Sequence, residues 1–162
     1  MEHIWTTTTS ELPPEWTIQH EIECLERIME RYVTHENLWC YRRFLCAHWT
    51  RNQASTLTPD ALNAIARCIQ ALLANEDVPL PTTIFFVSEL HYGWTCAHRA
   101  DNTKSYALRY VLWVLKHIRA LVPVQDMLPA EAHRLRQRVV SELGTMQDSQ
   151  HLTYLWSNCI NL

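Results

Sequence analysis

Residues 18–50 read IQHEIECLERIMERYVTHENLWCYRRFLCAHWT, and this stretch decides the fold class. In its first half, apolar side chains recur at alternating steps of four and three residues, which places them on one face of a helix. Glutamates and arginines fall largely on the opposite face. The apolar positions of this first predicted helix are Ile18, Ile22, Leu25, Met29 and Tyr32.

A second predicted helix follows after a short break at residues 34–37. Because the connection is so short, the two helices must be antiparallel neighbours. The stretch therefore predicts a helical hairpin. The apolar positions of the second helix are Leu38, Trp39, Tyr41, Leu45 and Trp49.

The next predicted helix has clear signals at both ends. Thr58 is a suitable N-cap, Pro59 suits the first helical position, and the stretch from Asn75 to residue 81 ends the helix. Its apolar stripe is Leu62, Ile65, Ile69 and Leu72. Residues 83–87 have strand propensity, but a lone strand would have no partner, so a helix is predicted over residues 82–98.

Three more helices complete the prediction. Asp101 is expected to cap a long helix, Pro129 to open the following one, and Gly144 to end it in a left-handed conformation. A last helix is predicted over residues 147–160. The apolar positions of the first two are Tyr106, Tyr110, Trp113, His117 and Leu121, then Ala132, Leu135, Val139 and Leu143.

Glycine is scarce in the 162 residues, which contain only Gly93 and Gly144 and no dipeptide typical of a β-hairpin. The sequence therefore predicts an all-α protein. Each helix pair leaves an apolar face that only a neighbouring pair can cover, so antiparallel helical hairpins stacked as an α-solenoid are expected. The predicted organisation is an N-terminal arm at residues 1–16 and a helical-repeat domain at residues 17–162.

Composition narrows the class of function. The net charge of −3 and the pI near 6.3 argue against nucleic acid as a partner. The N-terminus has no secretory signal pattern, and no stretch reaches the roughly 18 apolar residues of a membrane span, so a cytoplasmic location is expected. The six cysteines lack a C-x-x-C pair, which favours buried free thiols over disulfides or structural zinc.

No catalytic or metal-binding motif stands out. His91, Cys96 and His98 form the densest cluster of possible ligands, but they lack the spacing of a zinc site, so a small enzyme using His91 or His98 is the weakest hypothesis. The pair Ser88-Glu89 is interpreted as an ordinary helix pair. Exposed tryptophans among Trp5, Trp16 and Trp94 would mark a docking surface, whereas Trp39, Trp49 and Trp113 are assigned to the core.

The most specific motif runs from Tyr32 to Leu45. An aromatic residue ends the first helix, and Trp39 in the second helix is followed three and four residues later by Arg42 and Arg43. This pattern resembles the repeat of protein prenyltransferase alpha subunits, in particular that of the protein prenyltransferase alpha subunit repeat-containing proteins. The resemblance implies that the chain corresponds to the C-terminal part of such a protein. A weaker copy lies at residues 106–113. The family usually has Asn four residues before the Trp, where this chain has His35.

The resemblance implies a non-catalytic, geranylgeranyltransferase alpha-like subunit that scaffolds a catalytic beta subunit and docks the protein to be prenylated. The beta subunit would hold the zinc and the isoprenoid diphosphate, so this chain would bind no cofactor and show no activity alone. The alternative is a TPR-like helical-repeat adaptor unrelated to prenylation.

The candidate binding residues are Trp39, Tyr41, Arg42 and Arg43. Two interpretations of them remain open. In the first, which we prefer, they are structural residues that pack and form salt bridges between repeats. In the second, the tip of Arg42 or Arg43 lies exposed in a groove and contacts an acidic group of the beta subunit or an isoprenoid diphosphate.

Overall fold

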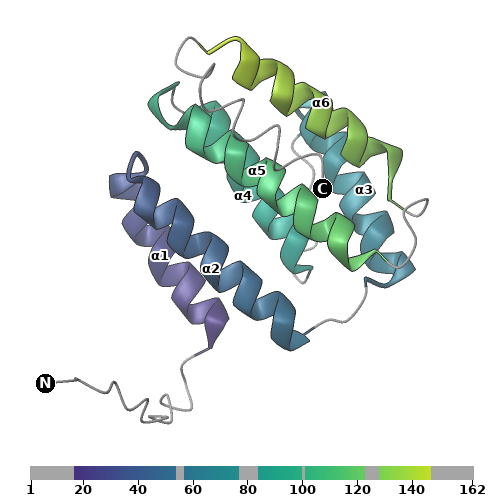
Figure 1. Ribbon diagram of the computed structural model, residues 1–162, viewed down its shortest axis with the longest axis horizontal. Helices are drawn as coiled ribbons and strands as arrows, with labels where there is room; N and C mark the ends of the chain where they lie inside the picture. Colours follow the sequence, from purple (N-terminus) through teal and green to yellow (C-terminus); the bar gives the residue numbers. More distant parts are fainter. Residues whose placement is uncertain (1–16, 54–56, 77–83, 100, 123–127, 147–162) are drawn as a thin grey trace, which may run out of the picture.

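The computed structural model describes residues 17–53, 57–76, 84–99, 101–122 and 128–146. All regular structure in these ranges is helical, which confirms the predicted all-α class (Figure 1). The predicted N-terminal arm and the predicted helix at residues 147–160 lie outside the described residues. The helices are α1 (Ile18–Tyr32), α2 (Glu36–Gln53), α3 (Pro59–Ala74), α4 (Phe85–Arg99), α5 (Asp101–Leu121) and α6 (Ala130–Gly144).

The ends of α3 follow the predicted signals. The Thr58 hydroxyl accepts a hydrogen bond from the Ala61 backbone N–H at 3.2 Å, and Pro59 occupies the first turn. At the other end, Asn75 adopts a left-handed conformation with φ 54°, and its N–H bonds to helical carbonyls. Asparagine tolerates this conformation better than most residues, so α3 stops there.

Two helix ends differ from prediction. Asp101 is not a flanking cap, because α5 begins at Asp101 itself. Gly144 is the last residue of α6 and has no positive φ. The next residue, Thr145, remains right-handed; its N–H bonds to the Ser141 and Glu142 carbonyls, and its hydroxyl donates to the Glu142 carbonyl at 2.7 Å. These hydrogen bonds satisfy backbone carbonyl groups at the C-terminal end of α6 without a residue in the left-handed conformation.

The helices lie in three pairs (Figure 1). The hairpin of α1 and α2 packs through α2 against α5, and α4 and α5 form the central pair. The third pair, α3 with α6, consists of helices that are not consecutive in the chain; α3 also packs on α4, and α6 on α5. The central pair therefore contacts both of the others.

The first helices of the hairpins α1–α2 and α4–α5 have the same length. Helices α1 and α4 both have 15 residues, and both their starts (18 and 85) and their ends (32 and 99) are 67 positions apart. At the same offset, Tyr106 and Arg109 of α5 correspond to Trp39 and Arg42 of α2. Their environments differ, because Trp39 and Arg42 are buried whereas Tyr106 and Arg109 are half-buried.

Most of the predicted core positions are buried. Ile22, Leu25 and Met29 of α1 and the predicted stripes of α3 and α6 are all inside. Two assignments are wrong, because Tyr32 is 54% exposed and Tyr41 is 39% exposed. Both residues lie at the edge of their helical face, where an aromatic ring can turn outward to solvent.

Helix α5 is the least well predicted. Of its proposed face only Tyr110 is fully buried, while Tyr106, Trp113, His117 and Leu121 are half-buried. Because α5 packs against α2, α4 and α6, it is enclosed on several sides, and a single apolar stripe is a poor guide. Its buried side chains are mainly Ala107, Leu108, Val111, Val114, Leu115 and Ile118.

Gly93 allows α4 and α5 to approach closely. A Cβ atom at this position would lie 2.9 Å from Val111 Cγ2, closer than real Cβ contacts, and 3.1 Å from Tyr110 Cδ1, which is tighter than most of them. The missing side chain therefore sets the spacing of the central pair. None of the described helices is both long and apolar enough to cross a membrane.

We expect Gly93→Ala to destabilise the protein. Overpacking against Val111 costs about 1–3 kcal/mol, and the better helix propensity of alanine recovers only about 1 kcal/mol. Gly144→Ala is the matched control, because nothing lies within 4 Å of its added Cβ, and it should be neutral or stabilising. Urea denaturation would measure the free energy of unfolding of both variants. Equal stability of the two variants would contradict the close approach of α4 and α5 at Gly93.

A cluster of charged side chains around Glu142 joins α4, α5 and α6. Its carboxylate lies 3.0 Å from Lys104 Nζ, 2.9 Å from Arg138 Nε and 3.8 Å from His98 Nε2. Partial burial alone would raise the pKa of Glu142, but hydrogen bonds from Lys104 and Arg138 outweigh it and lower the pKa. The ionised form of Glu142 is thus favoured in the folded state.

The Glu142 cluster predicts a pH dependence. A carboxyl group whose pKa is lowered by folding stabilises the protein above its unfolded pKa of about 4.3, and this stabilisation is lost as pH falls through the folded value. Glu142→Gln should lower the free energy of unfolding at pH 7 by about 0.5–1 kcal/mol and reduce its loss in acid. Denaturation curves from pH 3 to pH 7 would test this, with exposed Glu30→Gln as control. An unchanged acid limb would contradict the assignment.

Candidate functional site

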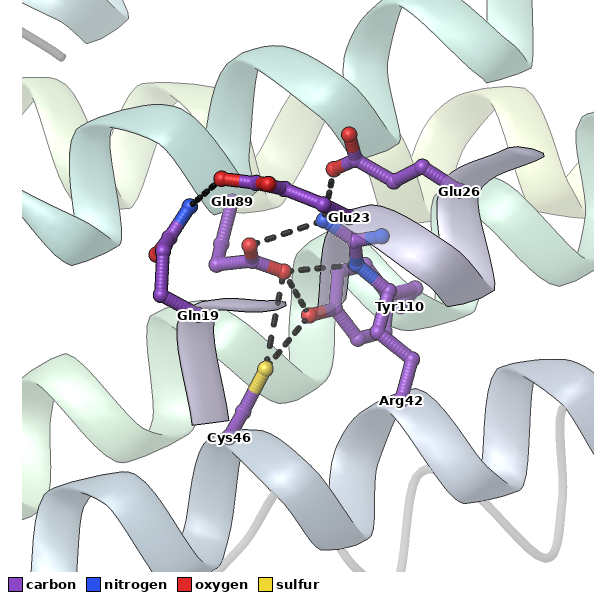
Figure 2. A network of polar contacts seen from close by, with 7 residues as sticks. All are labelled: Gln19, Glu23, Glu26, Arg42, Cys46, Glu89 and Tyr110. Atoms are coloured by element: carbon purple, nitrogen blue, oxygen red, sulfur yellow. Dashed lines mark hydrogen bonds and ion pairs between the residues drawn. The ribbon is translucent and has the colours of Figure 1, made fainter. Parts of the chain in front are cut away.

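Arg42 of α2 is the centre of the most elaborate polar arrangement in the described chain. Its side chain is 0% exposed, although it carries a charge that water would otherwise solvate. Four helices contribute partners: α1, α2, α4 and α5 (Figure 2). We refer to Arg42, Glu26, Glu89, Tyr92, Cys46 and Tyr110 as the Arg42 cluster.

Two carboxylates hold the Arg42 guanidinium. Nε donates to Glu89 Oε2 at 2.7 Å, and Nη2 donates to Glu89 Oε1 at 2.8 Å, so the pair is bidentate. Nη2 also donates to Glu26 Oε1 at 2.7 Å. Burial would lower the pKa of Arg42, but the charge of Glu89 reverses this effect and raises it. Arg42 therefore stays protonated.

Aromatic rings enclose the guanidinium. The carbon Cζ of Arg42 lies 3.8 Å from the centroid of the Tyr92 ring, which is a cation–π contact. Trp39 lies beside the cluster, with its ring centroid 5.5 Å from that of Tyr110. The Trp39 indole N–H donates to the Val33 carbonyl at 2.9 Å, so the same side chain also bonds to the end of α1.

Glu89 also receives two neutral donors. The hydroxyl of Tyr110 donates to Glu89 Oε2, and the Cys46 thiol lies 3.5 Å from the same oxygen. Burial and the negative charge of Glu89 raise the pKa of Tyr110 and of Cys46. The phenol and the thiol therefore remain protonated near neutral pH, so neither is activated as a nucleophile.

The energetic role of the cluster follows from its burial. Glu89 and Arg42 belong to different helix pairs, so their two hydrogen bonds connect the α1–α2 hairpin to the central pair. Removing one partner of such a buried pair leaves an uncompensated charge and typically costs about 3–5 kcal/mol. The remaining nitrogen, Arg42 Nη1, is buried with no acceptor among the described residues.

The four predicted binding residues lie in different environments. Trp39 and Arg42 are buried, and Arg43 is half-buried. Burial lowers the pKa of Arg43, and the positive charge of Arg109 on α5 also lowers it. Tyr41 is partly exposed and donates to Glu21 at 2.6 Å; this hydrogen bond raises the pKa of Tyr41.

The structure places Trp39 beside the Arg42 cluster, where its ring contacts Tyr110, whereas Tyr41 lies outside the cluster and bonds to α1. The guanidinium of Arg42 is enclosed and does not line a groove. To reach an anionic ligand it would have to leave Glu89 and Glu26.

Sequence reasoning missed Glu89, which is 2% exposed and is not part of an ordinary surface pair. A signal was present, because Glu89 is the only charged residue in the largely apolar stretch FFVSEL. Glu26 was assigned to the wet face of its helix but bonds to Arg42. The pairing of Arg42 with Glu89 spans 47 positions, which local patterns do not reveal.

The other candidate residues from the sequence do not form a metal site or an exposed tryptophan surface among the described residues. His91 and His98 are exposed, Cys96 is buried, and the described residues contain no group of His, Cys, Asp and Glu able to hold a metal ion. Trp94 is only 6% exposed and is part of the core, while Trp5 and Trp16 lie outside the described residues. The cysteines among the described residues are free thiols, with Cys46, Cys68 and Cys96 buried.

No protein-family model, curated protein or solved structure matches the chain. The described residues form an all-α protein with a buried arginine–carboxylate pair between α2 and α4.

We expect Arg42→Met to destabilise the protein by about 3–5 kcal/mol, because Glu89 is then left buried without its charge partner. The double variant Arg42→Met/Glu89→Leu should recover much of this loss. Glu26→Gln is the control; its side chain is 37% exposed, so the loss should stay near about 0–1 kcal/mol. Guanidinium denaturation of wild type, Arg42→Met, Glu89→Leu and the double variant gives the coupling energy. Additive losses in the double variant would contradict the proposed pairing.

Proposed function

We propose that this chain is a non-catalytic, alpha-subunit-like component of a protein geranylgeranyltransferase. The observation that carries the proposal is the motif Trp39-x-x-Arg42 together with its counterpart Tyr106-x-x-Arg109, one on the second helix of each repeated hairpin. This pattern resembles the repeat of prenyltransferase alpha subunits. The motif residues Trp39 and Arg42 lie where one hairpin meets the next, which suits a role in assembling repeats.

The chemistry of the Arg42 cluster supports a scaffolding role. Arg42 is bound by two carboxylates, and the neighbouring thiol and phenol are held protonated, so the cluster has no activated group. If the chain supplies positive charge to a diphosphate, Arg43 with Arg109 is a better source than Arg42. The charge of Arg109 on α5 acts on Arg43 of α2, and Arg43 is less buried than Arg42.

In this proposal the stacked helix pairs form part of an α-solenoid whose concave face embraces a catalytic beta subunit. Zinc and the isoprenoid diphosphate then belong mainly to that subunit, and the complex acts in the cytoplasm. The chain contributes a surface that positions the beta subunit and the protein to be prenylated.

The proposal predicts that the full chain copurifies with the beta subunit of a Rab-type geranylgeranyltransferase when the two are co-expressed. The lone chain should transfer no geranylgeranyl group. An unrelated helical protein is the negative control, and an established alpha subunit is the positive control. Failure to retain a beta subunit that the positive control retains would reject the proposal.

Within such a complex, Arg43→Gln should weaken use of the isoprenoid diphosphate and raise its KM several-fold. Arg134→Gln is the matched control, because Arg134 is an exposed arginine of α6 far from the motif in sequence. Kinetics of the two variants at a fixed beta-subunit concentration would separate a charge contribution from scaffolding alone. If the two variants have equal KM values, Arg43 contributes no charge to diphosphate binding, and the role of the chain is scaffolding alone.

A helical-repeat adaptor unrelated to prenylation is the second candidate. It is favoured by the exposed aromatic surface on the α1–α2 hairpin, which suits protein contact. If the chain ignores the beta subunit yet remains folded, this candidate replaces the first.

A further inference from the structure

Exposed apolar side chains gather on the hairpin of α1 and α2. Among the described residues, five large hydrophobic side chains are exposed, and four of them belong to these two helices. They are Phe44 at 61%, Tyr32 at 54%, Ile28 at 47% and Tyr41 at 39%. We call these four residues the hairpin patch. The fifth exposed side chain, Val140, belongs to α6.

The hairpin patch is continuous across the two helices. The hydroxyl of Tyr41 on α2 bonds to Glu21 of α1, and the ring of Tyr41 stacks on that of Phe44 with the centroids 6.2 Å apart. Glu21, Ile28 and Tyr32 follow one another at steps of seven and four residues, which places them on one side of α1. The patch is therefore a single surface to which both helices contribute.

The charges beside the hairpin patch are mainly positive. Arg27 and Arg31 are exposed and one helical turn apart, and each directly precedes a patch residue of α1. Arg51 is exposed on α2 seven positions after Phe44, which places it on the same side of that helix. Within the described part of the chain, the side chains of these three arginines form no ion pair or hydrogen bond. Apolar anchors beside unpaired cations suit a ligand that is both acidic and apolar.

Most acidic residues of the hairpin lie away from the patch. Glu23, Glu26 and Glu30 follow one another at steps of three and four residues on the other side of the buried stripe of α1, where Glu26 bonds into the Arg42 cluster. The single glutamate of α2 lies in its first turn, five positions before Tyr41, and so is turned about 140° away from it around the helix. The carboxylate of Glu21, which does lie at the patch, already accepts the Tyr41 hydroxyl. The surface around the patch therefore keeps its positive charge.

The N-terminal arm, residues 1–16, has the matching chemistry. It contains glutamates at positions 2, 11 and 15 and no lysine or arginine. Its apolar residues include Trp5 and Trp16, and indole rings bury a large area where they make contacts. By comparison, residues 147–162 contain one acidic residue and follow α6, which packs on α3 and α5. The arm is therefore the segment of this chain that best complements the patch.

The arm also joins α1 on the side of the patch. Thr17, the N-cap of α1, precedes Glu21 by four positions and Ile28 by eleven, so all three lie on one side of the helix. The 15 residues of α1 span about 22 Å. In contrast, the residues of the arm can span up to about 53 Å when extended. The arm is thus long enough to reach every residue of the patch.

We propose that the N-terminal arm binds the hairpin patch of its own chain, with its tryptophans on the aromatic rings and its glutamates beside Arg27, Arg31 and Arg51. Because the arm is tethered to α1, its effective concentration at the patch is on the order of millimolar. This favours the arm over a free partner of similar chemistry, and a protein that uses this surface must displace the arm. The inference does not rest on the prenyltransferase proposal.

Limited digestion of the full chain with chymotrypsin tests the proposal, with cleavage between Trp5 and Thr6 followed by mass spectrometry. The bound arm should protect this bond in the wild type. Phe44→Glu places a negative charge in the patch, so it should release the acidic arm and speed cleavage several-fold. Val140→Glu is the matched control, because it makes the same change on α6, and it should be cleaved like wild type. Circular dichroism would show that both variants keep their helices.

Charge reversal provides a second readout that is specific for the arm. The double variants Glu11→Lys/Glu15→Lys and Arg27→Glu/Arg31→Glu should each speed cleavage. All four changes together should restore protection, because the two surfaces again have opposite charges. Protection should not depend on protein concentration, since the contact lies within one chain. Equal cleavage of wild type and Phe44→Glu, no restored protection in the fourfold variant, or protection that grows with protein concentration would overturn the proposal.

Discussion

The bidentate pair between Arg42 and Glu89 is the interaction on which the arrangement of the helices depends. It joins helices of two different pairs inside a region from which water is excluded. Apolar packing could hold these helices together with equal strength, but it tolerates sliding. Two parallel hydrogen bonds to one carboxylate require a single alignment, and the contacts with Tyr110, Tyr92 and Glu26 allow few others. The cluster thus specifies how the hairpins meet.

This structural role limits which ligands Arg42 can bind. A charge that is surrounded by its own carboxylates has little attraction left for an external anion, so Arg42 is poorly suited to bind substrate. Functional contacts must then come from surfaces outside the cluster. Side chains available for such contacts include Phe44 and Tyr41, which are exposed on α2, and Arg43, which is half-buried.

The success of the sequence-based prediction varied with how each helix is buried. Helices α1, α3 and α6 bury one face, so their apolar periodicity indicated the correct core positions, such as Leu25, Ile65 and Leu135. Helix α5 is enclosed by three neighbours, and its pattern pointed to a face that is only partly buried. The pairing of α3 with α6 had no local signal, because it depends on where the central hairpin directs the chain.

By itself, the sequence determined that the chain is helical and roughly where most helices begin and end. These properties arise from interactions between residues a few positions apart, such as capping at Thr58 and amphipathic spacing. Only the tertiary structure decided that Glu89 is the partner of Arg42 and that Phe44 is exposed to solvent. A charge in a helix can be solvated or paired, and the choice depends on distant residues that folding brings near.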